Sequence, residues 1–285
     1  MTDEFETHRP RLLALAYRML GSWVEAQDVV QETHIRWSEV DAGTIDAPSA
    51  WLNRVVTNAC LDVLKSARVR RETYVGPWLP EPVATEAHML AGEPVDPETI
   101  SLAFLTLLER LSPLERAVYV LAEAFDYTHD EIAAVLGRDA SAVRQLLHRA
   151  REHVRNGRPR FAPDSDTHAR LLGAFASACA QGDVHAVEEL LATDVVARSD
   201  GGGRVRAALR PVHGANNVAR LVVGLVRKGG HSLRAEIREV NGWPALIMFD
   251  GDQTIGVTEI ETDGTHIFGL SVVTNPEKLR AIAPH

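Results

Sequence analysis

The chain has 285 residues, of which 45% are apolar and 24% charged, and its formal net charge is −9. This composition is ordinary for a folded protein of two or three domains, and the two cysteines, Cys60 and Cys179, exclude a disulfide framework and a cysteine-type zinc site. No apolar run approaches the roughly 20 residues that span a bilayer. The acidic start Met1–Glu4 lacks the basic region of a signal peptide. We therefore expect a cytoplasmic protein without a metal or cofactor.

Residues 8–68 place apolar side chains at helical spacing and predict helices that are interrupted at Gly21-Ser22 and before Pro48. The third helix contains Trp51 and ends in a cluster of cations. Aromatic, amide and cationic groups on one helix suit melted or single-stranded DNA, where bases stack and phosphates need neutralising. A solvated basic helix end explains the same residues equally well. The residues concerned are Asn53, Arg54, Thr57, Asn58, Lys65, Arg68, Arg70 and Arg71.

Residues 73–100 are expected to form an acidic, proline-rich linker. Between Glu72 and Ile100 the chain has five prolines, six acidic residues and no lysine or arginine. Few large apolar residues remain there to build a core. Trp78-Leu79, between Pro77 and Pro80, is the exception. Because a free linker has no use for an exposed tryptophan, we expect this piece to dock elsewhere on the chain.

Residues 112–154 carry the signals of a helix-turn-helix. Ser112–Glu115 combines an N-cap, a proline at the first helical position and a capping box, and Thr128–Glu131 repeats the capping box. Gly137 supplies the left-handed residue that ends the short second helix. A third helix follows over about 140–154, with an apolar face formed by Val143, Leu146, Leu147 and Ala150.

The other face of that third helix is basic. From Arg138 to Arg160 the chain has seven arginines against Asp139 and Glu152. Arginine pairs bidentately with guanine edges and glutamine with adenine, while further arginines contact phosphates, so we expect this helix to lie in the major groove of DNA. The alternative is a helical hairpin with a solvated basic face. The expected contact residues are Ser141, Arg144, Gln145, His148, Arg149 and Arg151.

Residues 165–285 predict an α+β domain with a curved antiparallel sheet. Helical patterns cover about 167–181, 185–192 and 214–228, and strand-like runs with Asn241-Gly242 and Asp263-Gly264 turns follow from Ser232 to Thr274. Gly201–Gly203 lacks the lysine of a phosphate-binding loop. It is either a flexible hairpin tip or a contact point for the linker, since glycines let another backbone approach closely. No spacing among His213, His231, Asp250 and Asp252 identifies an acid–base pair, so we expect no enzyme.

The first 155 residues resemble extracytoplasmic-function (ECF) RNA polymerase sigma factors. Asp28–Trp37 is similar to the polymerase-binding helix of sigma region two, Trp51–Arg71 to its promoter-melting, −10-reading helix, and 112–152 to region four, which reads the −35 element. Gln27 departs from the family, which commonly has glutamate there. The resemblance implies two all-α sigma domains, 1–72 and 101–158. It also implies a contact with core polymerase through Asp28, Gln31, Glu32, Arg36 and Trp37.

The remainder resembles the subgroup of these sigma factors with a C-terminal SnoaL-like domain, here 165–285. The similar segments are Trp78–Pro82, Asp200–Arg204 and Asn275–Leu279. The resemblance implies regulation in cis, with core RNA polymerase and promoter DNA as partners and no dedicated anti-sigma factor. A small molecule in the C-terminal cone is left open, and the alternative is a DNA-binding regulator whose cone is a ligand sensor or a cyclase- or isomerase-like enzyme. The implied interdomain residues are Trp78, Leu79, Pro80, Asp200, Gly201, Gly202, Gly203, Arg204, Asn275, Pro276 and Lys278.

Overall fold

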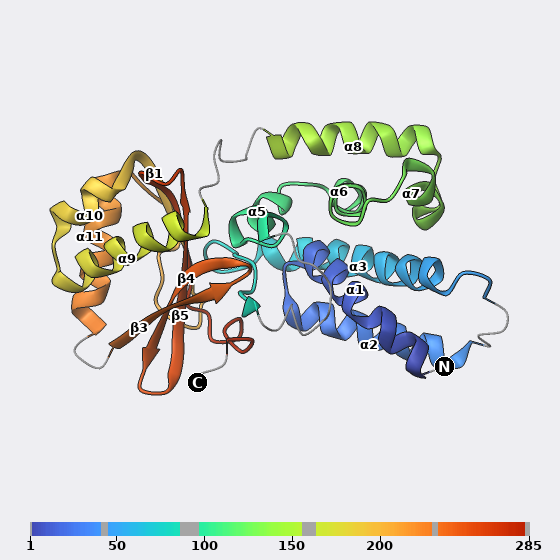
Figure 1. Ribbon diagram of the computed structural model, residues 1–285, viewed down its shortest axis with the longest axis horizontal. Coiled ribbons are helices and arrows are strands. Elements are labelled where there is room, and N and C mark those ends of the chain that lie inside the picture. Colours follow the sequence, from blue (N-terminus) through green and yellow to red (C-terminus); the bar gives the residue numbers. More distant parts are fainter. Residues whose placement is uncertain (1, 41–44, 86–96, 156–163, 230–232, 283–285) are drawn as a thin grey trace. The chain divides into compact units, whose positions relative to one another are not determined.

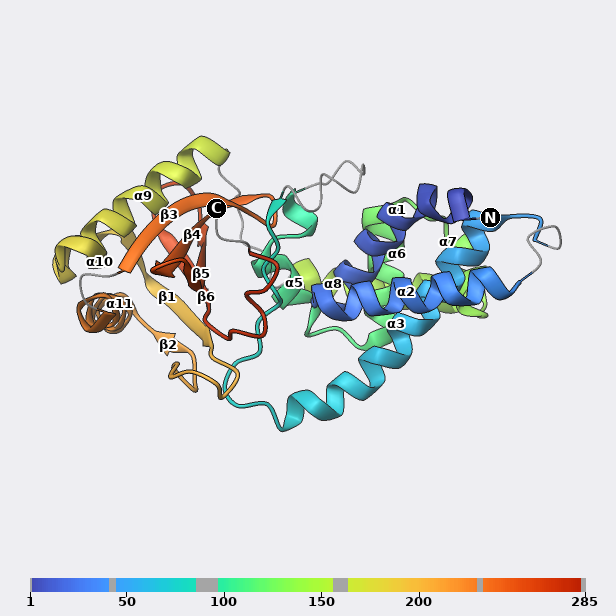
Figure 2. The same ribbon diagram turned by 90° about the horizontal axis from the view of Figure 1, so that it is seen from below.

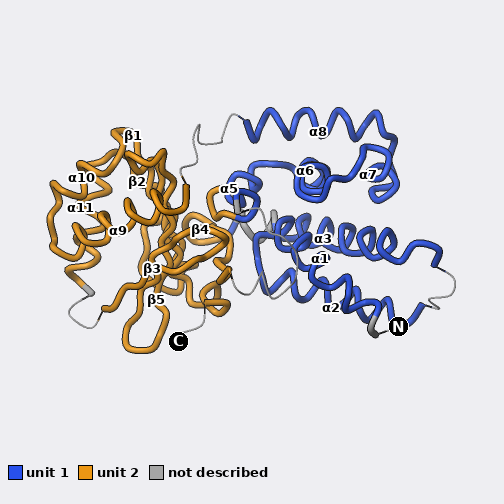
Figure 3. The backbone as a smooth tube through the Cα atoms, in the orientation of Figure 1, with its two compact units in different colours: residues 1–73, 86–100, 104–158 blue, residues 74–85, 101–103, 159–285 orange. Residues whose placement is uncertain are grey.

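The computed structural model describes residues 2–40, 45–85, 97–155, 164–229 and 233–282 (Figure 1), with the backbone alone at 2–3, 68–72, 97 and 229. The chain divides into two compact units (Figure 3). Unit 1 comprises residues 1–73, 86–100 and 104–158, and unit 2 comprises residues 74–85, 101–103 and 159–285. The expected linker 73–100 is therefore divided, because its first part packs with the C-terminal domain.

The regular secondary structure described in unit 1 is all helical. Helices α1 (Thr2–Leu20), α2 (Trp23–Glu39) and α3 (Pro48–Glu72) pack on one another (Figure 2). They bury apolar side chains such as Leu15, Tyr17 and Val56. The 3₁₀ turn η2 (Pro97–Thr99) leads into α5 (Leu102–Leu108), α6 (Pro113–Phe125), α7 (His129–Leu136) and α8 (Ala140–Arg155).

The caps of α6 and α7 explain where these helices begin. Ser112 Oγ accepts the Glu115 N–H at 3.3 Å, and Glu115 Oε2 accepts the Ser112 N–H at 3.0 Å. Thr128 and Glu131 make the same reciprocal pair at 3.3 and 2.8 Å. Gly137 has φ 61° and ends α7, as left-handed glycines commonly do. The helix-turn-helix predicted from the sequence is confirmed.

Unit 2 is an α+β domain. Helices α9 (Ser165–Gln181), α10 (Val184–Leu190) and α11 (Ala215–Gly229) accompany a six-stranded sheet. The strands are β1 (Leu191–Asp200), β2 (Val212–His213), β3 (Leu233–Val240), β4 (Trp243–Asp250), β5 (Gln253–Thr262) and β6 (Ile267–Val273), in the spatial order β2-β1-β6-β5-β4-β3. Asn241 and Gly242, at φ 54° and 77°, form the tight turn expected between β3 and β4.

The α+β prediction is confirmed, with one difference in the sheet. All neighbouring strands are antiparallel except β1 and β6, which pair in parallel from Leu191–Ile267 to Asp200–Val273. The hairpin signals that predicted an antiparallel sheet lie among β3 to β6. They carry no information about β1, which is separated from its partner β6 by β2, α11 and the three strands β3 to β5, a connection long enough for parallel pairing.

The two faces of the sheet are covered by different parts of the chain. One face packs under α9, α10 and α11, and its core includes Leu172, Val223 and Leu270. Because successive strand residues point to opposite faces, Ala245, Ile247 and Phe249 of β4 line the other face. That second core is completed by Leu79, Leu102, Leu279 and Ile282, which come from the linker, the start of α5 and the C-terminal tail. The linker is thus part of this core.

Candidate functional site

Helix α8 has the two faces that the sequence predicts. Val143, Leu147 and Ala150 are buried against the rest of unit 1. All six residues expected to contact DNA are exposed on the helix. Ser141, Arg144 and Gln145 follow one another at i, i+3 and i+4 and therefore lie on one side of the helix, near its N-terminal end.

Two of the exposed arginines of α8 are held by acidic residues of α6. Arg151 donates to Glu123 Oε1 from Nε at 2.9 Å and from Nη2 at 2.7 Å, and Arg149 lies 3.8 Å from Glu115. Arg144 and Gln145 make no side-chain hydrogen bond or ion pair with any described residue. Their side chains are therefore available for a ligand, whereas Arg149 and Arg151 orient α8 on α6.

The polar side of α3 is divided into two stripes. Arg54, Asn58 and Lys65 are exposed, as expected for a DNA-facing surface. Asn53 and Thr57 are only 2% and 0% exposed, so they do not share that surface. Arg54 and Asn58 are four residues apart, as are Asn53 and Thr57, but the second pair is offset from the first by about 100° around the helix. The side chains of Arg68, Arg70 and Arg71 lie outside those that the structure describes.

Asn53 and Thr57 are buried within unit 1, where α3 packs on α1 and α2 and also on α6 and α7. Tyr127, in the turn between α6 and α7, lies near the Asn53 side chain and Arg11. Burial raises the Tyr127 pKa, and these two partners partly offset the rise. Asn53 Oδ1 and Thr57 Oγ1 are buried without a hydrogen bond to any described residue. A buried polar atom without a hydrogen-bond partner costs about 1–3 kcal/mol, so the closed packing around α3 carries a penalty at each of these two atoms.

Two arginines of α1 hold the end of α6. The Arg11 and Arg18 guanidinium carbons lie 5.1 and 5.4 Å from the centroid of the Phe125 ring, and Arg11 Nη2 donates to Phe125 O at 3.4 Å. Arg116 of α6 is itself buried and donates to Met19 O of α1 at 2.8 Å and to Glu109 at 2.6 Å. The helix-turn-helix is therefore fastened to the first three helices through cationic side chains.

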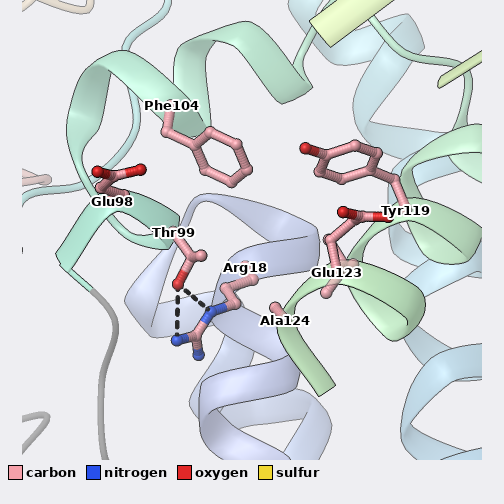
Figure 4. Close-up of a pocket in the computed structure, with 8 residues that line it drawn as sticks. Arg18, Glu98, Thr99, Phe104, Tyr119, Glu123 and Ala124 are labelled. Atoms are coloured by element: carbon pink, nitrogen blue, oxygen red, sulfur yellow. Dashed lines mark hydrogen bonds between the residues drawn. The ribbon is translucent and has the colours of Figure 1, made fainter. Parts of the chain in front are cut away.

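A small polar cavity of about 170 Å³ lies between α1, η2, α5 and α6. Arg18 donates to Thr99 Oγ1 from Nε at 3.2 Å and from Nη2 at 3.1 Å on one side of this cavity (Figure 4). Phe104 and Tyr119 form another wall, with ring centroids 6.1 Å apart. Because Arg18 also lies over Phe125, we assign these residues a structural role, in which they anchor η2 to α1.

Helix α2 presents an exposed face that includes four of the five residues expected to contact polymerase. Asp28, Gln31, Glu32 and Arg36 are exposed, and Arg36 forms an ion pair with Glu32. Trp37 is buried, with its ring 5.5 Å from that of Trp51, so it supports α2 on α3 instead of lying on the surface. The residues expected from the sequence to contact polymerase did not include Ile35. It is 52% exposed and follows Gln31 by one helical turn, so it adds a large apolar side chain to this face.

Asp200 is the centre of the best-defined polar site in unit 2. Its side chain is fully buried at the end of β1. Oδ1 accepts from Tyr74 Oη at 2.7 Å and from Gly202 N at 3.0 Å, and Oδ2 accepts from Leu79 N at 2.8 Å and from Lys278 Nζ at 2.7 Å. One carboxylate therefore joins the linker, the glycine loop and the C-terminal tail.

Two residues of the C-terminal tail beside Asp200, Lys278 and Asn275, also contact the first residues of the linker. Lys278 Nζ also donates to Leu79 O and lies 4.0 Å from the Trp78 ring centroid. Asn275 Nδ2 donates to Tyr74 Oη at 3.0 Å. Burial, with Asp200 alongside, raises the pKa of Tyr74, which therefore stays a donor. The sequence singled out Trp78, Asp200, Asn275 and Lys278, but it missed Tyr74, whose distant partner no local pattern reveals.

The linker has two further anchors in unit 2. Val83 and Asn241 exchange hydrogen bonds: Val83 N donates to Asn241 Oδ1 at 2.8 Å, and Asn241 N to Val83 O at 2.9 Å. Ala84 pairs with Val240 at the free edge of β3. Farther along, Leu102 N and Ala103 N at the start of α5 donate to Glu259 of β5 at 3.3 and 3.4 Å. Both ends of the stretch from Tyr74 to Ala103 are thus attached to one domain.

The Glu259 anchor predicts a specific pH dependence. Burial raises the pKa of this carboxyl from its ordinary 4.5 to about 8, although the hydrogen bonds from Leu102 and Ala103 lower it. Between these values the folded chain keeps a proton that the unfolded chain has lost, so the free energy of unfolding falls as the pH rises. Glu259→Gln is expected to remove this slope in denaturant titrations at pH 5, 6.5 and 8. Glu239→Gln, at an exposed position, is the control, and parallel curves for Glu259→Gln and wild type would contradict the assignment.

The groups considered for acid–base chemistry do not form a described site. His213 lies on β2, whereas Asp250 and Asp252 lie at the turn between β4 and β5, and all three are exposed. His231 lies outside the described residues.

Across the ranges that are described, none of the helices is both long and apolar enough to cross a bilayer.

Comparison with known protein families identifies the class of protein to which the chain belongs. Residues 5–70 match the family model "Sigma-70 region 2", and residues 101–154 match "Sigma-70, region 4". These segments contain α2, almost all of α3 and almost all of the helix-turn-helix described above. A chain with both regions is a sigma factor.

The relatives narrow the class to a family. The chain is 37% identical to ECF RNA polymerase sigma factor SigJ of Mycobacterium tuberculosis over 97% of its own length and 92% of that protein. It is 32% identical to the probable ECF sigma factor SigI of the same species, over 96% and 93% of the two chains. The crystal structure of SigJ is similar over the full length of both chains, with a TM-score of 0.77 and 32% identity.

The chain therefore belongs to the extracytoplasmic-function RNA polymerase sigma factors, in the subgroup whose α+β C-terminal domain is SnoaL-like. The resemblance inferred from the sequence is confirmed. The expectation that the chain is not an enzyme is confirmed as well, because these relatives are sigma factors. The sensor or cyclase-like alternative is not favoured.

Proposed function

We propose that this chain recruits core RNA polymerase to specific promoters in the cytoplasm and reads their −35 element with α8. The observation that carries the proposal is the exposed Ser141, Arg144 and Gln145 face on a doubly capped helix-turn-helix. Adding the purified chain to core polymerase should yield transcripts from a cognate promoter. The absence of transcripts across a library of genomic promoters would refute it.

Arg144→Ala tests the reading of bases by α8. A bidentate arginine–guanine contact discriminates by about 1–3 kcal/mol, so promoter affinity is expected to fall roughly tenfold to a hundredfold, with relaxed preference at one base pair. Arg155→Ala, exposed on the same helix, is the matched control. Competition binding of the holoenzyme with promoters mutated through the −35 element is the measurement. An equal loss on every sequence would mean that Arg144 contacts only phosphates.

We assign the −10 element to α3. Arg54, Asn58 and Lys65 are available on its exposed stripe, and the chain continues through Arg68, Arg70 and Arg71. Asn53 and Thr57 are included in the proposal on one condition. They are buried in the form described, in which α3 packs on α6 and α7 as well as on α1 and α2, so we propose that the helix-turn-helix leaves α3 before they contact DNA.

We assign the contact with core polymerase to the exposed face of α2. Asp28, Gln31, Glu32 and Arg36 supply its polar groups, and Ile35 supplies an apolar one. Trp37 supports this face from beneath through Trp51. A mixed face of polar groups and a large exposed aliphatic side chain is suited to a protein partner.

We further propose that the C-terminal domain regulates the sigma domains in cis through the docked linker. The support is the set of contacts that Asp200, Asn241 and Glu259 make with residues 74–85 and 102–103. Because the regulatory domain is part of the same chain, the proposal requires no dedicated anti-sigma factor and no small molecule in the cone. Co-purification of the chain from its host, followed by identification of bound proteins and metabolites, tests both points.

A further inference from the structure

The C-terminal domain contains a long stretch of positive charge that its linker contacts do not use. From Gly201 to Ala235 the chain has seven lysines and arginines and no aspartate or glutamate, although the net charge of the whole chain is −9. Three of these cations, Arg204, Arg206 and Arg210, lie in the loop between β1 and β2, and all three are exposed. A local excess of arginine on an otherwise acidic protein is the electrostatic mark of a nucleic-acid contact.

The backbone of this loop is held in place. Arg204 N and Val205 N donate to Gly201 O at 2.9 and 3.2 Å. A Cβ added at Gly201 would lie 2.6 Å from Val205 O, so the loop folds closely on itself. Gly202 N is bound by the buried carboxylate of Asp200. Because the backbone is already ordered, the arginines on this loop lose little further backbone entropy when they bind a ligand.

Two of the three arginines are available for a ligand. Arg206 and Arg210 make no side-chain hydrogen bond or ion pair with any residue in the described ranges. Arg204 pairs with Glu277 at 2.8 Å, but both side chains are more than half exposed. Exposed ion pairs of this kind contribute about 0–1 kcal/mol, so a phosphate group competes readily with Glu277 for Arg204.

The loop lies against the segment that directly continues α3. The Val75 Cβ is 3.2 Å from the position of a Cβ at Gly203, and the Leu209 Cα is 3.6 Å from that of a Cβ at Gly76. Only three peptide steps separate Arg71, near the end of α3, from Tyr74. The extended chain therefore spans about 11 Å at most between them. This covalent connection keeps the loop within reach of any DNA bound at the end of α3.

We infer that the loop Gly201–Arg210 is an additional DNA-binding surface, which contacts the phosphate backbone of promoter DNA through Arg204, Arg206 and Arg210. The inference rests on the proposed function of α3. Val205 and Leu209, which are 40% and 65% exposed, lie on the same loop, so a protein surface is the competing partner. Phosphate is favoured because its negative charge matches three neighbouring cations, and no carboxylate interrupts the stretch.

The test is salt-dependent promoter binding by the holoenzyme. Arg206→Ala/Arg210→Ala is compared with Arg170→Ala/Arg280→Ala, which removes two exposed arginines elsewhere in the same unit. Anisotropy of a labelled promoter fragment is followed at several KCl concentrations. Losing two phosphate contacts should lower the slope of log K against log salt by about two. Affinity should fall about tenfold at moderate salt, equally for promoters with intact and altered −35 elements.

Each outcome decides the inference. Arg206→Lys/Arg210→Lys should keep most of the affinity and the slope, because a phosphate contact requires charge more than shape. If the alanine pair behaves like its control, the inference is wrong while the proposed function stands. If the alanine pair weakens binding to core polymerase without DNA by the same factor, the loop binds polymerase and the DNA contact is overturned. If the wild-type holoenzyme forms no promoter complex, the proposed function fails as well.

Discussion

Replacing Arg11 with alanine is expected to raise the affinity of the free protein for a single-stranded −10 oligonucleotide by about tenfold. Arg11 holds the end of α6 through the Phe125 ring and the Phe125 carbonyl oxygen. A cation–π contact and a hydrogen bond from a charged donor are together worth about 1–3 kcal/mol. Since 1.4 kcal/mol changes an equilibrium constant tenfold, losing them shifts α6 and α7 measurably away from α3.

The gain in affinity arises from a shift in populations. DNA that needs Asn53 and Thr57 binds only those molecules in which α6 and α7 have left α3, so the apparent affinity is reduced by the fraction that is open. Weakening the attachment increases this fraction without changing the binding surface itself. The closed form is already weakened by the buried Asn53 Oδ1 and Thr57 Oγ1, which find no hydrogen-bond partner among the described residues. A modest perturbation is therefore sufficient.

The matched control for this experiment lies on the same helix. Arg9 is one of the less buried residues of α1 and pairs with Glu6, at a side-chain exposure of 43%. Arg9→Ala removes the same charge without touching α6 and should leave the affinity unchanged. Hydrogen exchange at the amides of α7 should quicken for Arg11→Ala alone. If Arg11→Ala binds the oligonucleotide as wild type does while α7 exchanges faster, covering of α3 does not limit DNA binding.

Local chemistry made the helix-turn-helix readable from the sequence. The signals of Ser112–Glu115, Thr128–Glu131 and Gly137 involve residues at most four apart, so they form wherever the segment folds. The Asn241-Gly242 turn is of the same kind, because its left-handed φ values select those two residues. The exposed arginines of α8 followed directly, since the apolar face defines the opposite one.

Packing between segments that are distant in the chain could not be predicted from such local sequence signals. Asn53 and Thr57 are polar, and polarity predicted exposure, but the packing of α3 on helices from distant parts of the chain, α6 and α7 among them, buries them. Trp37 was expected on the polymerase-binding surface because the resemblance to sigma region two includes it, yet it packs on Trp51. The unusual Trp78 correctly indicated that the linker docks. Its neighbour Leu79 is the residue that enters the core, and Glu259 was missed because a buried carboxylate carries no sequence signal.

Asp200→Asn is expected to free the start of the linker and to broaden the promoter spacing that the sigma factor accepts. Asp200 receives four donors, and Lys278 is its charged partner at a side-chain exposure of 12%. The amide that replaces the carboxylate turns an N–H toward donors and removes the charge opposite Lys278. Breaking a buried ion pair in this way costs about 3–5 kcal/mol.

The effect on spacing follows from where the linker is attached. Tyr74–Thr85 and Leu102–Ala103 are bound to the same domain, so unit 2 fixes the distance between the point that follows α3 and the point where α5 begins. The wild-type holoenzyme should therefore transcribe best at one −35 to −10 spacing. Freeing one attachment makes this distance adjustable, so transcription from promoters one or two base pairs longer or shorter should rise severalfold relative to the optimum.

Two measurements distinguish the release of the linker from its expected effect on promoter spacing. The Leu79 amide is protected by Asp200 Oδ2, and its hydrogen exchange should quicken about a hundredfold in Asp200→Asn. Lys278→Met removes the same ion pair from its other side and should broaden the spacing profile in the same way, whereas Asp252→Asn at the exposed β4–β5 turn should do neither. Faster exchange at Leu79 with an unchanged spacing profile would mean that linker docking stabilises unit 2 without influencing promoter choice, and regulation in cis would have to act through another contact.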